Sequence, residues 1–136
     1  MNEREMYPTI GQLLMNHGYS VAYEVPPHLG SARSVDVVGI RPRKRVAVTV
    51  EAKLGHYSQV MRQASVRLFI SDFVYISFPS DYAHFVLKHR CNDLNAKGIG
   101  LICVDREAEE LIPANQSPYV DNARRMDLIN MAKIRR

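Results

Sequence analysis

Strict alternation of apolar and other side chains over residues 45–53 (RVAVTVEAK) is the feature that most constrains the fold of this chain. Side chains of a β-strand point alternately to its two faces, so this pattern predicts a strand with one apolar face. The opposite face carries Glu51 and Lys53 side by side at the end of the strand. A second acid, Asp36, stands in an apolar run at residues 34–40 (SVDVVGI), which predicts another strand across a short basic turn.

Asp36, Glu51 and Lys53 together indicate chemistry on a phosphate. An acid among valines is costly to bury unless a partner or a metal satisfies it. Mg²⁺ takes oxygen ligands and keeps several waters, so the two carboxylates and the backbone carbonyl of Ala52 offer part of a shell for Mg²⁺, or for Mn²⁺. A lysine beside that cation can hold a water or stabilise the charge that develops on a phosphate. The alternative interpretation of a Glu-x-Lys at a strand end is an ordinary structural pair.

The N-terminal part of the chain predicts a helix followed by a strand. The helix is expected to begin near residues 4–7, because Pro8 is tolerated in a first turn, and to end at Gly18. Residues 19–25 alternate as a strand. One side of that strand is expected to carry Val21, Tyr23 and Val25, and the other side Ala22 and Glu24.

The rest of the chain predicts alternating helices and strands. Apolar positions with helical spacing or in continuous runs give a helix at 57–68, a buried and parallel strand at 73–78, a helix at 82–95, a strand at 99–104, a short strand at 111–112 and a helix at 119–134. Three sequential strands favour an antiparallel meander, and the next helix then crosses to a parallel strand. The sequence therefore predicts an α/β fold with a mixed sheet flanked by helices on both faces.

Length and composition predict one domain over residues 1–136, with a C-terminal helical extension at about 115–136. No apolar run approaches the length that crosses a bilayer, so no membrane partner is expected. Cys91 and Cys103 are expected to be reduced thiols of a cytoplasmic protein. The net charge of +4 gives a mild preference for polyanions, and basic residues gather at 41–45 and at 124–136. The alternative interpretation of each cluster is solvated surface charge.

The order helix, three strands, helix, strand, with Val35-Asp36 followed by Glu51-Ala52-Lys53, resembles the PD-(D/E)xK nuclease superfamily, whose restriction-endonuclease-like core is αβββαβ. Archaeal Holliday-junction resolvases and Mrr-like restriction enzymes have a similar layout, and small uncharacterised members look more similar still. The resemblance covers roughly residues 3–104. Val35 stands where the family's motif has a proline.

The resemblance implies roles for particular side chains. Asp36 and Glu51 would be metal ligands and Lys53 the catalytic lysine. Related nucleases carry a glutamine on the second helix that reaches the active site, and Gln63 matches that position. Arg67 lies one turn further on the same helix face and would contact a phosphate, the alternative being a surface hydrogen bond between Gln63 and Arg67.

The resemblance also implies a further carboxylate, because many members place one on the first helix. Glu3 and Glu5 are both candidates, and Glu24 on the first strand is a third. For each of them the alternative is a solvated carboxylate with no role.

The function expected from the resemblance is Mg²⁺-dependent endonucleolytic hydrolysis of DNA. Phosphates would be held by basic residues, namely Arg33, Arg41, Arg43, Lys44, Arg62 and Arg67. Cutting both strands of a duplex with one site per chain requires a homodimer or two successive nicks. The alternative function is a non-catalytic nucleic-acid-binding or regulatory protein on the same fold.

Overall fold

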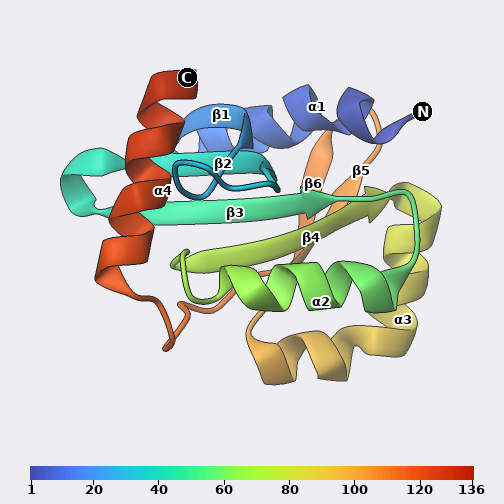
Figure 1. The fold of residues 1–136 in the computed structure, drawn as a ribbon. Helices are drawn as coiled ribbons and strands as arrows, with labels where there is room; N and C mark the ends of the chain where they lie inside the picture. Colours follow the sequence, from blue (N-terminus) through green and yellow to red (C-terminus); the bar gives the residue numbers. More distant parts are fainter.

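The computed structural model describes residues 1–136 as an α/β fold, in which four helices flank a six-stranded mixed sheet (Figure 1). The elements are α1 (Glu3–Asn16), β1 (Ser20–Val25), β2 (Val35–Arg41), the 3₁₀ turn η1 (Pro42–Lys44), β3 (Val46–Ala52), α2 (Tyr57–Arg67), β4 (Phe73–Pro79), α3 (Ser80–Lys97), β5 (Gly100–Val104), β6 (Ala108–Ile112) and α4 (Asn122–Arg135). The predicted α/β class and mixed sheet are confirmed.

The strands lie in the sheet in the order in which they occur along the chain. The pairs β1–β2, β2–β3 and β5–β6 are antiparallel, whereas β4 is parallel to both β3 and β5. The expected meander and crossover are therefore both present. Because β2 and β3 are antiparallel, the beginning of β2 lies beside the end of β3, which brings Asp36 to Glu51.

The two faces of the sheet are covered unequally. On one face α1 packs against the alternate residues of β3 that were expected to be apolar, including Val48 and Val50. On the other face α4 covers β1, β2 and the start of β3, while α2 and α3 cover β4 and β5 (Figure 1). Glu51 and Lys53 belong to this second face, at the end of β3, where α2 begins after a short loop.

The first helix begins earlier than its proline suggested. Asn2 caps the helix, because its side chain accepts a hydrogen bond from the backbone N–H of Glu5. Pro8 therefore lies inside the helix rather than in its first turn. The earlier start gives Glu3 and Tyr7 defined places on α1, and both lie at the candidate site. Gly18, with a φ of +90°, follows the helix end as predicted.

The expected alternation of β1 is broken at Glu24. Ala22 and Val25 both belong to the core under α4, whereas Tyr23 packs against α1. Val25 thus lies on the opposite side from Tyr23, contrary to the prediction. The cause is the left-handed backbone at Glu24, whose φ is +51° and which interrupts the two-residue period.

The C-terminal elements differ from their predicted bounds. The sixth strand is longer than expected, and the last helix begins at Asn122 rather than at residue 119, with Asp121 as its cap. Leu128 and Ile129 of this helix are fully buried, so α4 forms part of the core. Both cysteines are free thiols, as predicted. None of the helices has the length and apolar character needed to cross a bilayer.

Candidate functional site

Asp36 and Glu51 lie next to each other where the β2–β3 ladder ends. The last pair of that ladder is Val37 with Val50, and Asp36 and Glu51 are the next residues on the two strands. The two carboxylates are close enough for Asp36 to shift the pKa of Glu51. The pairing of β2 with β3 therefore holds two carboxylates next to each other.

Hydrogen bonds fix both oxygens of Asp36. Oδ2 accepts the backbone N–H of Ala52 at 2.7 Å, and Oδ1 accepts the hydroxyl of Tyr7 at 2.9 Å. The Tyr7 ring stacks on Tyr23 with an interplanar angle of 5°. Burial and the neighbouring Asp36 raise the pKa of Tyr7, so this hydroxyl remains a donor at neutral pH. Asp36 is consequently positioned by α1 and β3 together.

Glu51 is buried and paired with an arginine. Oε1 accepts the Nε–H of Arg67 at 2.9 Å, and the two side chains are 4% and 12% exposed. The pKa of Glu51 is raised from 4.5 to about 7, chiefly by burial and also by the nearby Asp36 carboxylate, while Arg67 acts in the opposite direction. A buried carboxylate beside another carboxylate is therefore held in place by one cationic partner from α2.

Lys53 continues the strand beyond Glu51 and is one-quarter exposed. Its backbone N–H bonds the carbonyl of Ser77, so β4 fixes the position of its backbone. Its ammonium lies 3.6 Å from a carboxylate oxygen of Glu3 on α1. The predicted placement of Glu51 and Lys53 on one face is confirmed, and Glu3 is the first-helix acid that pairs with Lys53.

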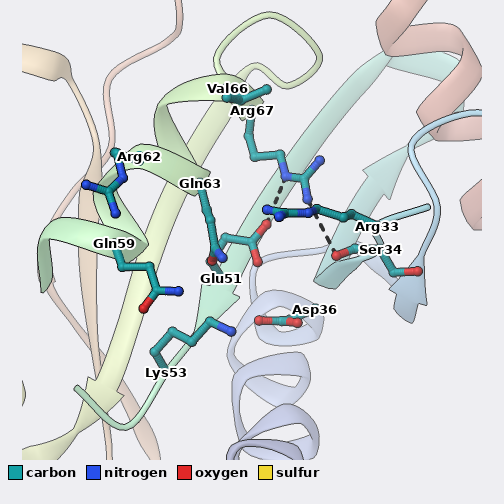
Figure 2. Close-up of a pocket in the computed structure, with 10 residues that line it drawn as sticks. All are labelled: Arg33, Ser34, Asp36, Glu51, Lys53, Gln59, Arg62, Gln63, Val66 and Arg67. Atoms are coloured by element: carbon teal, nitrogen blue, oxygen red, sulfur yellow. Dashed lines mark hydrogen bonds and ion pairs between the residues drawn. The ribbon is translucent and has the colours of Figure 1, made fainter. Parts of the chain in front are cut away.

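These side chains line one open cavity of about 630 Å³ between α2 and the ends of β2 and β3. In Figure 2 the side chains of Asp36, Glu51, Lys53 and Gln63 point into the same space, with Arg62 further out along α2. Arg67 reaches from α2 to Glu51 and, at 3.5 Å, to the carbonyl of Ser34. The complete lining is Arg33, Ser34, Asp36, Glu51, Lys53, Gln59, Arg62, Gln63, Val66 and Arg67.

The other two candidate acids are directed elsewhere. Glu24 forms an ion pair with Arg4 at 2.9 Å. Glu5 is exposed in the first turn of α1 and, unlike Glu3, forms no ion pair. The structure thus distinguishes among three glutamates that the sequence left equivalent, because the register of α1 was uncertain and the backbone turn at Glu24 was not visible.

The predicted phosphate-binding residues fall into two groups. Arg33, Arg62 and Arg67 line the cavity with the two carboxylates. Three others do not: Arg41, Arg43 and Lys44 lie at the opposite end of β2, where η1 connects it to β3. The six residues therefore occupy two separate places, because a strand of this length separates its own ends by roughly 20 Å.

Tyr7 and Ser77 are the residues that sequence reasoning missed. Tyr7 follows Glu3 by four residues, which puts both on one helix face, and this spacing was the available signal. The Ser77 hydroxyl donates to the carbonyl of Glu51 at 3.2 Å from the buried strand β4. No sequence pattern indicates that contact, because it depends on the register between β3 and β4.

The donor set suits a hard divalent cation that retains waters. Asp36 and Glu51 supply carboxylate oxygens, and Mg²⁺ is commonly bound by one or two carboxylates together with substrate oxygens. Nowhere in the chain do three or more His, Cys, Asp or Glu side chains gather closely enough to hold a metal by themselves. Any cation here would therefore be shared between the protein, water and substrate.

The same architecture occurs in a solved structure. That structure, a protein of unknown function from Silicibacter pomeroyi, superposes with a TM-score of 0.74 at 21% identity, over 98% of this chain and 86% of that one. No protein-family model and no curated protein matches the chain. At this identity the likeness concerns the fold alone.

Proposed function

We propose that this chain is a nuclease that hydrolyses phosphodiester bonds of DNA with Mg²⁺, or Mn²⁺ in its place. The observation that carries the proposal is the proximity of the Asp36 and Glu51 carboxylates on neighbouring strands, with Lys53 lining the same cavity. Two adjacent carboxylates repel each other unless a cation or a proton lies between them. The order of α1 to β4, which is αβββαβ when the 3₁₀ turn η1 is left aside, supports membership of the PD-(D/E)xK superfamily as part of the same proposal.

In this proposal each side chain has a task that matches its position. A bound cation would polarise the phosphate and make a water more acidic. Asp36 and Glu51 would hold that cation, and Tyr7 would keep Asp36 oriented through its hydrogen bond. Lys53 would leave Glu3 to hold the attacking water or the charge that develops on the phosphate.

The surrounding donors would position the nucleic acid. Gln63 would donate to the strand that is cut, and Arg33 and Arg62 would contact phosphates on either side of the cleaved bond. Cleavage of both strands would require a second site, so we further propose a homodimer or two successive nicks. Sedimentation of the chain with and without a duplex distinguishes these two arrangements.

The test is a cleavage panel on branched, duplex and single-stranded DNA with Mg²⁺ and with Mn²⁺. Asp36→Asn and Lys53→Ala are each expected to lower the rate by about a hundredfold or more. Asp105→Asn and Lys97→Ala are matched controls, since both residues are exposed and lie outside the cavity. Circular dichroism establishes that every variant is folded. Equal rates in the wild type and the two site variants would remove this mechanism.

A second function is favoured by one contact. Arg67 already neutralises part of the charge of Glu51. This is the role that an arginine would have in a protein that binds nucleic acid without a metal. In that case titration calorimetry with Mg²⁺ and Mn²⁺ would give no binding heat, while DNA would still bind. Metal binding that is lost in Asp36→Asn would exclude this second function.

A further inference from the structure

A second cavity, of about 770 Å³, lies at the end of β2, whereas the candidate site lies at the beginning of that strand. Three segments line it, namely the loop after α1, the end of β2 with η1, and the last turn of α4. The two basic clusters of the sequence, which lie about ninety residues apart, contribute to it together. Its lining is Gly18, Ser20, Ile40, Arg41, Pro42, Arg43, Lys44, Lys133 and Arg136.

All the charged residues that line this cavity are basic. Five of its nine lining residues are arginine or lysine and none is acidic. The ion pairs of the structure are Arg4–Glu24, Lys53–Glu3, Arg67–Glu51 and Arg125–Asp72, and none of them involves these five side chains. Like charges gathered without acidic partners repel one another, so an anion bound here would relieve that repulsion.

One wall of the cavity is fixed rather than flexible. The guanidinium of Arg41 lies 4.2 Å from the centre of the Tyr19 ring and donates to the carbonyl of His17. The backbone at Gly18, with a φ of +90°, passes close to the same guanidinium. Arg43, Lys44 and Lys133 are exposed around this wall. The arrangement combines one oriented guanidinium with exposed cations, which suits phosphate oxygens.

Helix α4 extends from the neighbourhood of the candidate site to the basic cavity. Near its beginning, Arg124 lines a cavity of about 440 Å³ whose wall also includes Val66 and Arg67 of the candidate site, together with one acid, Asp127. Near its end, Lys133 lines the basic cavity. Helix α4 has 14 residues and is therefore roughly 21 Å long. Basic side chains thus occur at the candidate site, along α4 and at the basic cavity.

We propose that the basic cavity binds backbone phosphates of the same nucleic acid that enters the candidate site, several nucleotides away from the reacting bond. This rests on the proposed function for the identity of the polyanion. Arg41 follows Asp36 by five residues of strand, a separation of roughly 17 Å. B-form DNA rises 3.4 Å per base pair, so the two sites lie about five base pairs apart. The substrate class is accordingly a polynucleotide long enough to reach both.

The experiment measures binding rather than cleavage. Fluorescence polarisation in EDTA, over a series of salt concentrations, compares a labelled duplex of about two dozen base pairs with a labelled trinucleotide. The test variant is Arg43→Ala/Lys133→Ala, which removes one cation from each segment. The matched control is Lys88→Ala/Lys97→Ala, which removes the same charge from exposed positions of α3. Competition with inorganic tripolyphosphate shows whether a small anion suffices.

The expected result is a loss of duplex affinity of about tenfold in the test variant, with the slope of log K against log salt reduced by about 1.8. The control variant and all trinucleotide affinities stay close to wild type. The proposal would be overturned if the test variant kept the duplex affinity and salt slope of the wild type. It would also be overturned if the test variant lost only its binding of tripolyphosphate and still bound the duplex normally. If the wild type binds in this pattern but cuts nothing, the proposed hydrolysis fails while the basic cavity stands.

Discussion

Arg67 donates from Nε to Oε1 of Glu51 at 2.9 Å, and this contact joins α2 to the end of β3 inside the candidate cavity. The pair is nearly buried, and Glu51 also lies beside the Asp36 carboxylate. The contact therefore serves two purposes: it lowers the cost of an ionised Glu51 and fixes the direction of that carboxylate. Any cation bound by Asp36 and Glu51 would have Arg67 as its neighbour.

Arg67→Ala is expected to destabilise the protein by about 3 kcal/mol at pH 8, because it leaves a buried carboxylate without its partner. The loss should be smaller at pH 6, where Glu51 can take up a proton. Urea denaturation at the two pH values measures both. Arg62→Ala, an exposed arginine of the same helix, should change stability by less than about 0.5 kcal/mol. Equal losses at pH 6 and pH 8 would contradict this explanation.

The pKa of Glu51, raised from 4.5 to about 7 in the folded protein, predicts how stability depends on pH. Between these values the folded state binds a proton that the unfolded state has released, so stability falls as pH rises through this window. The fall should amount to roughly 1 to 3 kcal/mol and should level off above pH 7. The measurement is urea denaturation in EDTA from pH 4.5 to 8. The variant Glu51→Gln should not show this fall in stability, because its side chain does not titrate. Parallel curves for the two proteins would show that Glu51 does not titrate in this range.

Tyr7→Phe removes the donor to Oδ1 of Asp36 while keeping the ring that stacks on Tyr23. Stability should fall by about 1 kcal/mol. Cation affinity, measured by calorimetry, should change as well, because one oxygen of Asp36 loses its orientation. Tyr23→Phe is the matched control, since it removes the hydroxyl of the stacked ring and leaves Asp36 untouched. If both variants alter cation affinity equally, ring packing rather than the hydrogen bond determines the orientation of Asp36.

The main elements of the fold were predictable because their signals are local. Alternation in β3 placed Glu51 and Lys53 on one face, and helical spacing gave the stripe of α2 that packs on β4. What was missed depends on contacts between distant segments. The cap at Asn2 extended α1 through Pro8, and the backbone turn at Glu24 reversed the side on which Val25 lies.

The candidate site was predictable in its carboxylates and lysine but not in its partners. The pairing of β2 with β3 brings Asp36 to Glu51, whereas the packing of α1 and α2 on the sheet supplies their hydrogen-bond donors Tyr7 and Arg67. For the basic residues, it is their arrangement in space that the sequence did not predict. Arg43 and Lys133 are remote from each other in sequence, yet they line one cavity, which lies away from the carboxylates.

Asp72 carries a second buried ion pair, and it serves the fold rather than the site. Its Oδ1 accepts from Arg125 of α4 at 2.8 Å, and its Oδ2 accepts the backbone N–H of Ala47 at 2.8 Å. Its carbonyl accepts the N–H of Ser117. One residue thus attaches α4, the segment before it and the start of β3 to one another.

Asp72→Asn is expected to cost about 3 kcal/mol, because the amide can still accept from Ala47 but leaves Arg125 without a buried counter-charge. Urea denaturation measures the loss, and Arg124→Met, on the exposed side of the same helical turn, should cost less than about 0.5 kcal/mol. Under conditions where Asp72→Asn remains folded, its cation affinity should equal that of the wild type, because Asp36 and Glu51 lie outside this network. A large fall in cation affinity in the folded variant would mean that α4 positions the candidate site and does more than cover the sheet.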